Sequence, residues 1–184
     1  MPHIGEYYTP EQLKTYLKDL ANLLWKGKHT YDIFIVGGGA LAIEYGARAL
    51  TQDIDGIWPK DSYFKECVRK VADKHGINPD WCNSDFARSP SYTDAIIQHS
   101  HLLIPLRGLN IYTVNTDLLL CMKLVAGRFK DLVDADYLVN VLRSKGEMVD
   151  AETVRSWLKK YYTDYKKSFE LNEETTTFIG RLRP

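Results

Sequence analysis

The sequence has no excess of charge of either sign. Lys and Arg together number 24, Asp and Glu also number 24, and the formal net charge is zero. Such a chain has no global positive field to attract nucleic acid from a distance, so any polyanion must be bound at a local site. Hydrophobic residues make up 45% of the 184 residues, which is enough to bury one well-formed core.

Cysteines and long apolar runs are also scarce. The three cysteines are odd in number and lack Cys-x-x-Cys spacing, which argues against a disulfide framework and a zinc site. The longest apolar stretch, LLLCMKLVAG, is interrupted by Lys123 and is too short to span a bilayer. The N-terminal residues MPHIGEYYTPEQ carry no signal-peptide pattern. We therefore expect a soluble cytoplasmic protein with no membrane association.

Hydrophobic spacing predicts a chain that changes in character along its length. The expected elements, in order, are a helix capped by Thr9, a strand over 31–36, a glycine turn, a helix over 40–50, a strand over 53–58, a helix over 61–75, a surface loop over 77–91, a hairpin of 101–106 and 109–114, and three helices that end near 127, 143 and 165. Weak periodicity from 172 onward predicts a loosely held tail. The order indicates an α/β domain over 1–128 with a helical C-terminal region, 129–184, packed on it.

A glycine turn and an acid pair stand close together in IVGGGALAIEYGARALTQDIDGIW, residues 35–58. Asp53 and Asp55 are two apart on a predicted strand, so they point to the same face, where carboxylates can hold Mg²⁺. The turn at Gly37, Gly38 and Gly39 leaves backbone amides free for a triphosphate. The alternative is a solvated strand end with no ligand.

The same glycines also fit a dinucleotide-binding fingerprint. Gly37, Gly39 and Ala42 match G-x-G-x-x-G/A, in which a helix N-terminus holds a pyrophosphate. That interpretation requires alternating parallel strands and a single acid for the ribose. Here the next strand carries two acids, and the alternation soon stops.

Two blocks of the sequence carry a family resemblance. The segment GGGALAIEYGARALTQDID resembles the signature of nucleotidyltransferases related to DNA polymerase beta, and with LLLCMKLVAGRFKDLVDADYL it is similar to AbiE-type toxin nucleotidyltransferases and their bacterial relatives. The resemblance covers about 33–138. It implies a nucleotidyltransferase fold, a small mixed β-sheet with flanking helices, and transfer of a nucleotide from an NTP to an acceptor with Mg²⁺ as cofactor.

The resemblance also implies roles for individual residues. Gly38 and Gly39 match the turn near the phosphates, and Asp53 and Asp55 match the metal ligands. Lys123 matches the lysine of the later block, and Asp131 or Asp134 matches its acid.

The chain departs from the family pattern at the third carboxylate, which many members place on a later strand. The candidate strand LNIYTV offers Asn110 and Tyr112 but no acid. Asp85, in WCNSDFARSP, is the best substitute in the sequence, although turn formation also explains that residue. The sequence therefore does not predict the classical arrangement of three carboxylates.

Lys123 is the only charge in the middle of the apolar helix DLLLCMKLVAGR. It either extends to solvent along its own stem or meets an anion. An unbroken helix would hold Lys123 and Asp134 about 16 Å apart. A break near Gly127 would let them converge, with Lys123 on phosphate and Asp131 or Asp134 as orienting group or base. Helix N-terminal charge or solvent exposure explains the aspartates equally well.

Two further segments leave alternatives open. Arg48 and Thr51, just before the acid pair, are candidates for phosphate or ribose contacts, although Arg48 could instead pair with Glu44 or face water. The run WLKKYYTDYKK, 157–167, mixes bases and aromatics as RNA-binding segments do. Helical spacing favours a core stripe there, made of Val154, Trp157, Leu158 and Tyr161.

Taken together, these features predict an Mg²⁺-dependent nucleotidyltransferase. Its acceptor would be RNA, a protein or a small molecule, and the family resemblance adds a toxin role with an antitoxin protein as partner. The alternative is an inactive relative that keeps the fold as an NTP-binding or protein-interaction module.

Overall fold

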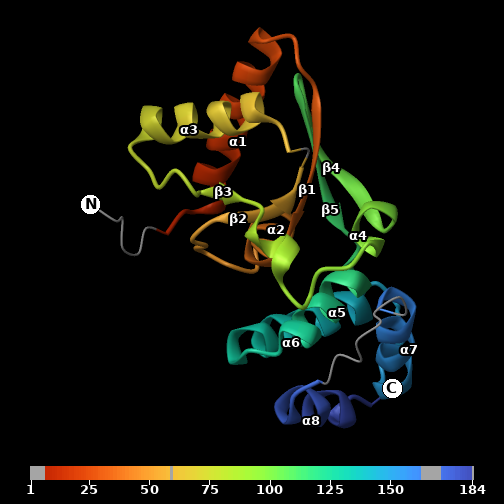
Figure 1. The fold of residues 1–184 in the computed structure, drawn as a ribbon. Coiled ribbons are helices and arrows are strands. Elements are labelled where there is room, and N and C mark those ends of the chain that lie inside the picture. The colour runs from red at the N-terminus through yellow and green to blue at the C-terminus, as the bar shows by residue number, and fades with distance from the viewer. Residues whose placement is uncertain (1–6, 59, 163–170, 184) are drawn as a thin grey trace. The chain divides into compact units, whose positions relative to one another are not determined.

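The computed structural model describes residues 7–58, 60–162 and 171–183 of the chain (Figure 1). They form two compact units. The first contains Met1–Ala87 and Ser100–Val114, and the second contains Arg88–His99 and Asn115–Pro184. The sheet lies in the first unit and the C-terminal helices lie in the second.

The first unit is built on a five-stranded mixed sheet. Its strands are β1 (Tyr31–Val36), β2 (Ile54–Ile57), β3 (Cys82–Asn83), β4 (Ser100–Leu106) and β5 (Leu109–Val114). They lie in the order β3-β2-β1-β5-β4. β1 is antiparallel to β2 and parallel to β5, β2 is parallel to β3, and β4 and β5 form the predicted hairpin.

Helices cover one face of this sheet. They are α1 (Pro10–Lys26), α2 (Gly37–Tyr45) and α3 (Ser62–His75), and a short 3-10 turn, η1 (Asp85–Arg88), follows β3. α1 contacts α2, α3 and β5, and α2 contacts β1 and β2 (Figure 1). The side chains of Ile33, Ile35, Ile54 and Ile111 point toward the helices and are fully buried. Because side chains alternate along a strand, the intervening side chains, such as Phe34 on β1 and Tyr112 on β5, point to the opposite face of the sheet.

Local sequence signals explain where the helices begin and end. The predicted cap at Thr9 is present, with Thr9 and Gln12 bonded reciprocally in a capping box. α2 begins at Gly37, inside the expected turn, and ends at Tyr45 because Gly46 adopts a left-handed conformation with φ +61°. The predicted helix over 40–50 was therefore placed too late in the chain.

The second unit consists of helices. They are α4 (Ala95–Gln98), α5 (Thr116–Ala126), α6 (Phe129–Ser144), α7 (Ala151–Tyr161) and α8 (Glu173–Arg181). α5 contacts both α6 and α7, and α7 contacts α8. The loosely held tail was a wrong prediction, because Asn172 caps α8 and Thr175 is buried.

The core stripe on α7 is confirmed. Three of its four predicted members, Val154, Leu158 and Tyr161, are buried, as expected for a helix face packed inward, and the fourth, Trp157, is half-buried. The rest of the proposed RNA-binding run, 163–167, lies outside the described residues.

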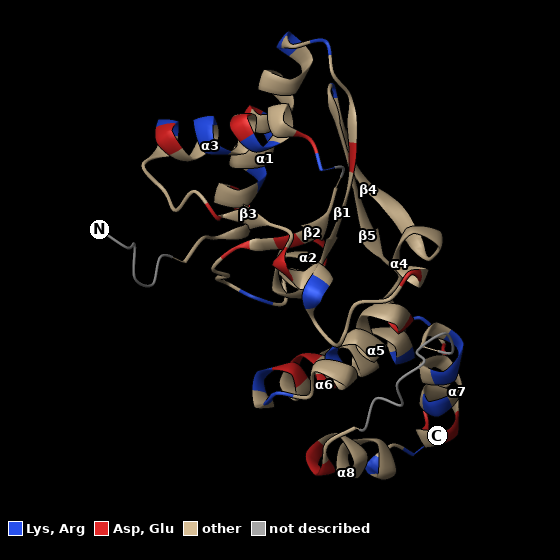
Figure 2. Ribbon diagram, viewed as in Figure 1, with Lys and Arg blue, Asp and Glu red and all other residues tan. Residues whose placement is uncertain are grey.

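The fold class is as predicted, a mixed sheet with flanking helices followed by C-terminal helices. Both basic and acidic residues lie on α3, α6 and α7 (Figure 2). Cys67, Cys82 and Cys121 are buried free thiols. In the described part of the chain, no helix combines the length and apolar character needed to span a bilayer.

Candidate functional site

The acid pair lies directly beside the glycine turn. In the antiparallel pairing of β1 and β2, Asp55 is opposite Val36, the last residue before the glycines. A Cβ atom built on Gly37 would lie 3.5 Å from Oδ2 of Asp55. A Cβ atom on Gly39 would lie 3.4 Å from the backbone oxygen of Asp53. The chain therefore brings the turn and the carboxylates to one place.

Gly37 and Gly39 are each favoured at this point for a geometric reason. Gly37 has φ +64°, a conformation that side chains disfavour. At Gly39 an added Cβ would approach the Cα of Ile54 to 3.3 Å. The three glycines form the first turn of α2, where backbone N–H groups lack helical partners and can donate to phosphate.

Arg48 and Thr51 belong to the same cluster. A Cβ atom on Gly38 would lie 3.1 Å from Oγ1 of Thr51 and 3.5 Å from Nη1 of Arg48. Thr51 is buried, and an isolated bridge to Tyr8 holds its backbone. All the predicted residues of the first unit, from the glycines to the acids, therefore lie together.

Asn83 extends the site toward the edge of the sheet. It pairs with Asp55 across β2 and β3, and its Nδ2 donates to Oδ2 of Asp53 at 3.0 Å. Its Oδ1 accepts from the backbone N–H of exposed Asp85 at 3.0 Å. The sequence assigned this stretch to a surface loop, because a two-residue strand has no detectable periodicity.

The carboxylates also act on the neighbouring thiol. Burial raises the pKa of Cys82, and the negative charges of Asp53 and Asp55 raise it further. Cys82 therefore stays a neutral thiol beside the acid pair and adds no further anionic ligand.

The donor set fits Mg²⁺ that is shared with a bound nucleotide. The described residues contain no group of three or more His, Cys, Asp and Glu side chains able to hold a metal by themselves. Mg²⁺ typically uses one or two carboxylates together with substrate phosphates and waters. Asp53 and Asp55 supply two carboxylates beside the glycine turn, so a complete protein cage is not required.

A dinucleotide-binding half is excluded by the strand directions. The fingerprint requires the strands on either side of its helix to run parallel in one sheet. Here β1 and β2, which flank α2, are antiparallel neighbours. The dinucleotide interpretation of the glycines is therefore wrong.

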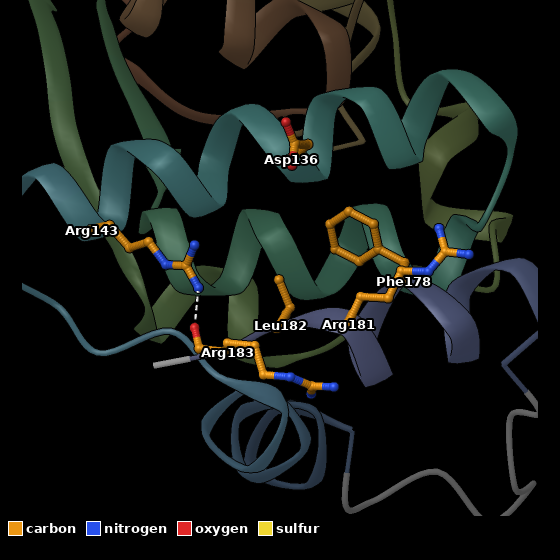
Figure 3. Close-up of a pocket in the computed structure, with 6 residues that line it drawn as sticks. All are labelled: Asp136, Arg143, Phe178, Arg181, Leu182 and Arg183. Carbon is orange, nitrogen blue, oxygen red and sulfur yellow. Dashed lines mark hydrogen bonds between the residues drawn. The ribbon is translucent and has the colours of Figure 1, made fainter.

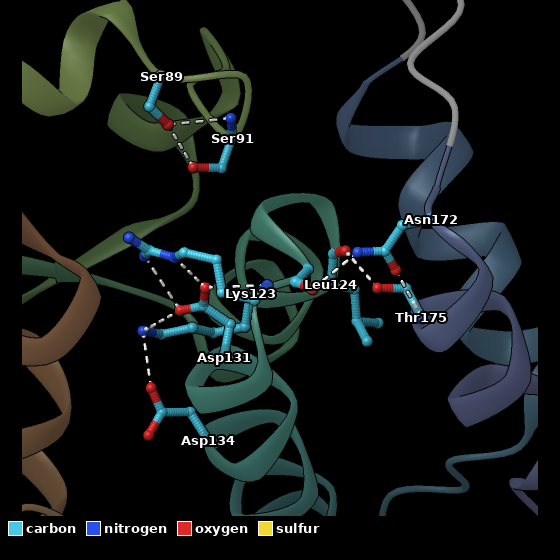
Figure 4. Close-up of polar contacts among 10 residues, drawn as sticks. Ser89, Ser91, Lys123, Leu124, Asp131, Asp134, Asn172 and Thr175 are labelled. Atoms are coloured by element: carbon cyan, nitrogen blue, oxygen red, sulfur yellow. Dashed lines mark hydrogen bonds and ion pairs between the residues drawn. The ribbon is translucent and has the colours of Figure 1, made fainter.

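In the second unit, Lys123 forms an ion cluster with the two predicted aspartates (Figure 4). Its Nζ lies 3.2 Å from Oδ1 of Asp131 and 2.8 Å from Oδ2 of Asp134. Lys123 is only 5% exposed, Asp131 is fully buried, and Asp134 is 8% exposed. Lys123 therefore meets anions and does not extend to solvent.

The break at Gly127 makes this convergence possible. Gly127 ends α5 with φ +61°, and α6 turns back so that its first turns face Lys123. Nδ2 of Asn172 donates to the carbonyl of Gly127 at 2.8 Å, and Oγ1 of Thr175 donates to that of Leu124 at 3.2 Å (Figure 4). The end of α5 is thus fixed by the start of α8.

Arg128 also stabilises the charge of Asp131. Its Nε donates to Oδ2 of Asp131 at 2.6 Å. Burial alone would raise the pKa of Asp131, but the hydrogen bond from Arg128 and the positive charge of Lys123 hold that pKa below its usual value. Asp131 is consequently an ionised carboxylate inside the helical unit.

A pocket on another face of α6 was not predicted from the sequence. It has a volume of about 420 Å³, and its lining is rich in arginine (Figure 3). The lining residues are Asp136, Arg143, Phe178, Arg181, Leu182 and Arg183. Asp136 is two residues beyond Asp134, about 200° around the helix, so the pocket and the ion cluster use different faces.

Comparison with known proteins identifies the family of the chain. The family model described as "Nucleotidyltransferase of unknown function (DUF6036)" matches residues 11–178. No curated protein and no solved structure matches the chain. The match spans both units, so the chain belongs to this family of nucleotidyltransferases of unknown function.

Proposed function

We propose that the chain transfers a nucleotide from an NTP to an acceptor hydroxyl and that it uses Mg²⁺ held by Asp53 and Asp55. One observation carries the proposal, the position of Asp55 opposite Val36 with its carboxylate 3.5 Å from a Cβ atom built on Gly37. A carboxylate at the mouth of a glycine turn is suited to a metal that bridges protein and phosphate.

The residues of the first unit have separate roles in the proposed reaction. The N–H groups of the first turn of α2 donate to the phosphates, and Arg48 and Thr51 contribute a positive charge and a hydroxyl beside them. Asn83 holds the Asp53 carboxylate in place. When bound, Mg²⁺ would offset phosphate charge in the transition state. The acceptor hydroxyl gives up its proton to solvent as its oxygen attacks the α-phosphorus, the bond between the α-phosphorus and the oxygen that bridges to the β-phosphate breaks, and pyrophosphate leaves.

Lys123, Asp131 and Asp134 remain predicted catalytic residues. Their buried pairing holds a cation between two acids, which suits a structural role, whereas a phosphate contact by Lys123 is supported by the family resemblance. The resemblance to AbiE-type enzymes supports a toxin role with an antitoxin partner, on sequence alone.

The direct test is nucleotide transfer. Purified protein is incubated with Mg²⁺ and each α-³²P-labelled NTP, together with total cellular RNA or total protein. We expect label to enter one acceptor class with the wild type and none with the Asp53→Asn/Asp55→Asn double variant. Equal labelling by the two proteins would reject the proposal.

A second function is favoured by one feature of the sheet. β5 carries no acid, so no third carboxylate comes from the strand where many relatives place one. An inactive NTP-binding module would bind NTP with Mg²⁺ in calorimetry and yet label no acceptor in the transfer assay. That combination of results selects the module over the enzyme.

A further inference from the structure

The sheet face opposite α1, α2 and α3 carries a row of apolar side chains beside the acid pair. Phe34 on β1 is paired with Ile57 on β2 and with Tyr112 on β5, and Tyr112 is paired with Leu102 on β4. Directly paired residues project to the same face of a sheet. The four side chains therefore form one continuous strip across four strands, which we call the apolar shelf.

The shelf is accessible, whereas the helix-covered face is not. Phe34, Ile57 and Tyr112 are half-buried, and Leu102 is 48% exposed. On the other face of the same strands, Ile33, Ile35 and Ile111 are fully buried. Since neighbouring strands lie about 4.8 Å apart, the shelf is roughly 14 Å across. A strip of this size can receive one flat ring system.

Aromatic rings lie at the centre of the shelf. The rings of Phe34 and Tyr112 are stacked, with centroids 5.0 Å apart and an interplanar angle of 22°. Stacked rings offer their outer faces to a further ring, and every nucleobase has such a π face.

Polar groups bound the shelf on both sides along the strands. On one side, Asp55 lies across from Val36, two residues from Phe34 and therefore about 7 Å along the strand. On the other side, Nδ2 of Asn110 donates to Oδ1 of Asp32 at 2.8 Å. The apolar surface is thus a limited patch, and Phe34 in it lies two residues along β1 from the position opposite Asp55.

We propose that the apolar shelf binds the nucleoside of the NTP, with the base stacked on the Phe34–Tyr112 pair. The inference rests on the proposed function, because the triphosphate fixes which part of the ligand reaches the shelf. With the phosphates at the glycine turn and Asp55, the ribose extends the ligand toward the next row of side chains. Stacking provides affinity without reading base edges, so we expect similar affinities for all four NTPs.

The test compares ATP with inorganic tripolyphosphate, which has the phosphates but no base. Mg²⁺-dependent affinities are measured by calorimetry for the wild type, Phe34→Leu, Tyr112→Leu and the matched control Tyr112→Phe. We expect each leucine variant to bind ATP about tenfold more weakly and tripolyphosphate equally well, since one stacked base contributes that much. The Tyr112→Phe variant keeps the ring and should bind both ligands like the wild type.

Other outcomes overturn the inference in distinguishable ways. Unchanged ATP affinity in both leucine variants rejects the proposed binding of the base to the shelf. An equal loss of affinity for ATP and for tripolyphosphate also rejects it, because it signals general damage to the protein. If the wild type binds neither ligand with Mg²⁺, the proposed function itself has failed. If a leucine variant fails to fold, the inference is tested instead by the fluorescence of 2-aminopurine riboside triphosphate bound to the wild type. Stacking quenches its emission on binding, and unquenched emission in the bound state rejects the inference.

Discussion

Asn83 donates a hydrogen bond from Nδ2 to Oδ2 of Asp53 at 3.0 Å, and it sits directly across from Asp55 in the pairing of β2 and β3. An amide thus occupies a position from which a carboxylate could also reach a shared metal.

The substitution Asn83→Asp should place a third carboxylate beside the pair. Without Mg²⁺ we expect repulsion among the like charges to lower the stability by about 1–3 kcal/mol. Mg²⁺ should restore it, because metal binding to the folded state offsets the repulsion. Thermal unfolding with and without Mg²⁺ measures both effects. Asn83→Ala removes the hydrogen bond without adding charge and serves as the control. An identical response to Mg²⁺ in the two variants would contradict the placement of the metal.

Gly37 allows a second test with a close control. Gly37→Ala forces a left-handed conformation on alanine at a cost of about 1–2 kcal/mol and adds a methyl group 3.5 Å from Oδ2 of Asp55. Gly76 has the same φ of +64° but nothing within 4 Å of an added Cβ atom. We expect both alanine variants to lose similar stability in urea unfolding, and only Gly37→Ala to lose NTP affinity. Equal NTP affinities of the Gly37→Ala and Gly76→Ala variants would show that the glycine turn is not part of the nucleotide site.

The buried ion cluster predicts a large effect at Lys123. Lys123→Met removes the cation from a site where Asp131 is fully buried, so we expect a loss of about 3 kcal/mol in the free energy of unfolding. Lys130 is exposed on α6, and Lys130→Met should change stability by less than about 0.5 kcal/mol.

The double variant Lys123→Met/Asp134→Leu tests the pairing itself. Its loss in the free energy of unfolding should be smaller than the sum of the two single losses by about 1–3 kcal/mol. Each single substitution leaves one charge of the pair unpaired, and the second substitution removes that charge. Strict additivity would argue against the pair. Transfer activity, measured where each variant is folded, then shows whether Lys123 also serves the reaction.

Asp131 predicts an acid-dependent loss of stability. Its pKa is lowered in the folded protein, so its contribution is fully present above the unfolded value of 3.8 and is lost as the pH falls through the lower folded pKa. We expect Asp131→Asn to be less stable than the wild type at neutral pH and the difference to shrink below about pH 4. Urea unfolding between pH 2.5 and 7 measures this. A constant difference would show that the ion pairs do not stabilise the charged form.

Most of the first unit could be predicted from the sequence because its signals are local. Each signal determines the conformation of only a few neighbouring residues, as seen in the cap at Thr9, the apolar run of β1 and the hairpin around Gly108. The proximity of the glycine turn to Asp55 was also predictable, since a short helix returns the chain beside the strand it left.

Long-range pairing explains what the sequence did not show. β3 is only two residues long, so Asn83 could be placed beside Asp53 only by its pairing with β2. The shelf likewise depends on the register that sets Phe34 between Ile57 and Tyr112. The helix α8 is held by hydrogen bonds from Asn172 and Thr175 to the end of α5, and these contacts join positions 45 and 51 residues apart in the chain.

The central claim is that Asp53 and Asp55 hold a metal that the nucleotide shares, and calorimetric titration with ATP tests it most directly. The wild type and the control Asp73→Asn, which removes an exposed charge on α3, should bind ATP with Mg²⁺ and at least tenfold more weakly with EDTA. Asp53→Asn and Asp55→Asn should lose this Mg²⁺ dependence while unfolding cooperatively like the wild type. Undiminished Mg²⁺-dependent binding in both of these variants would contradict the account.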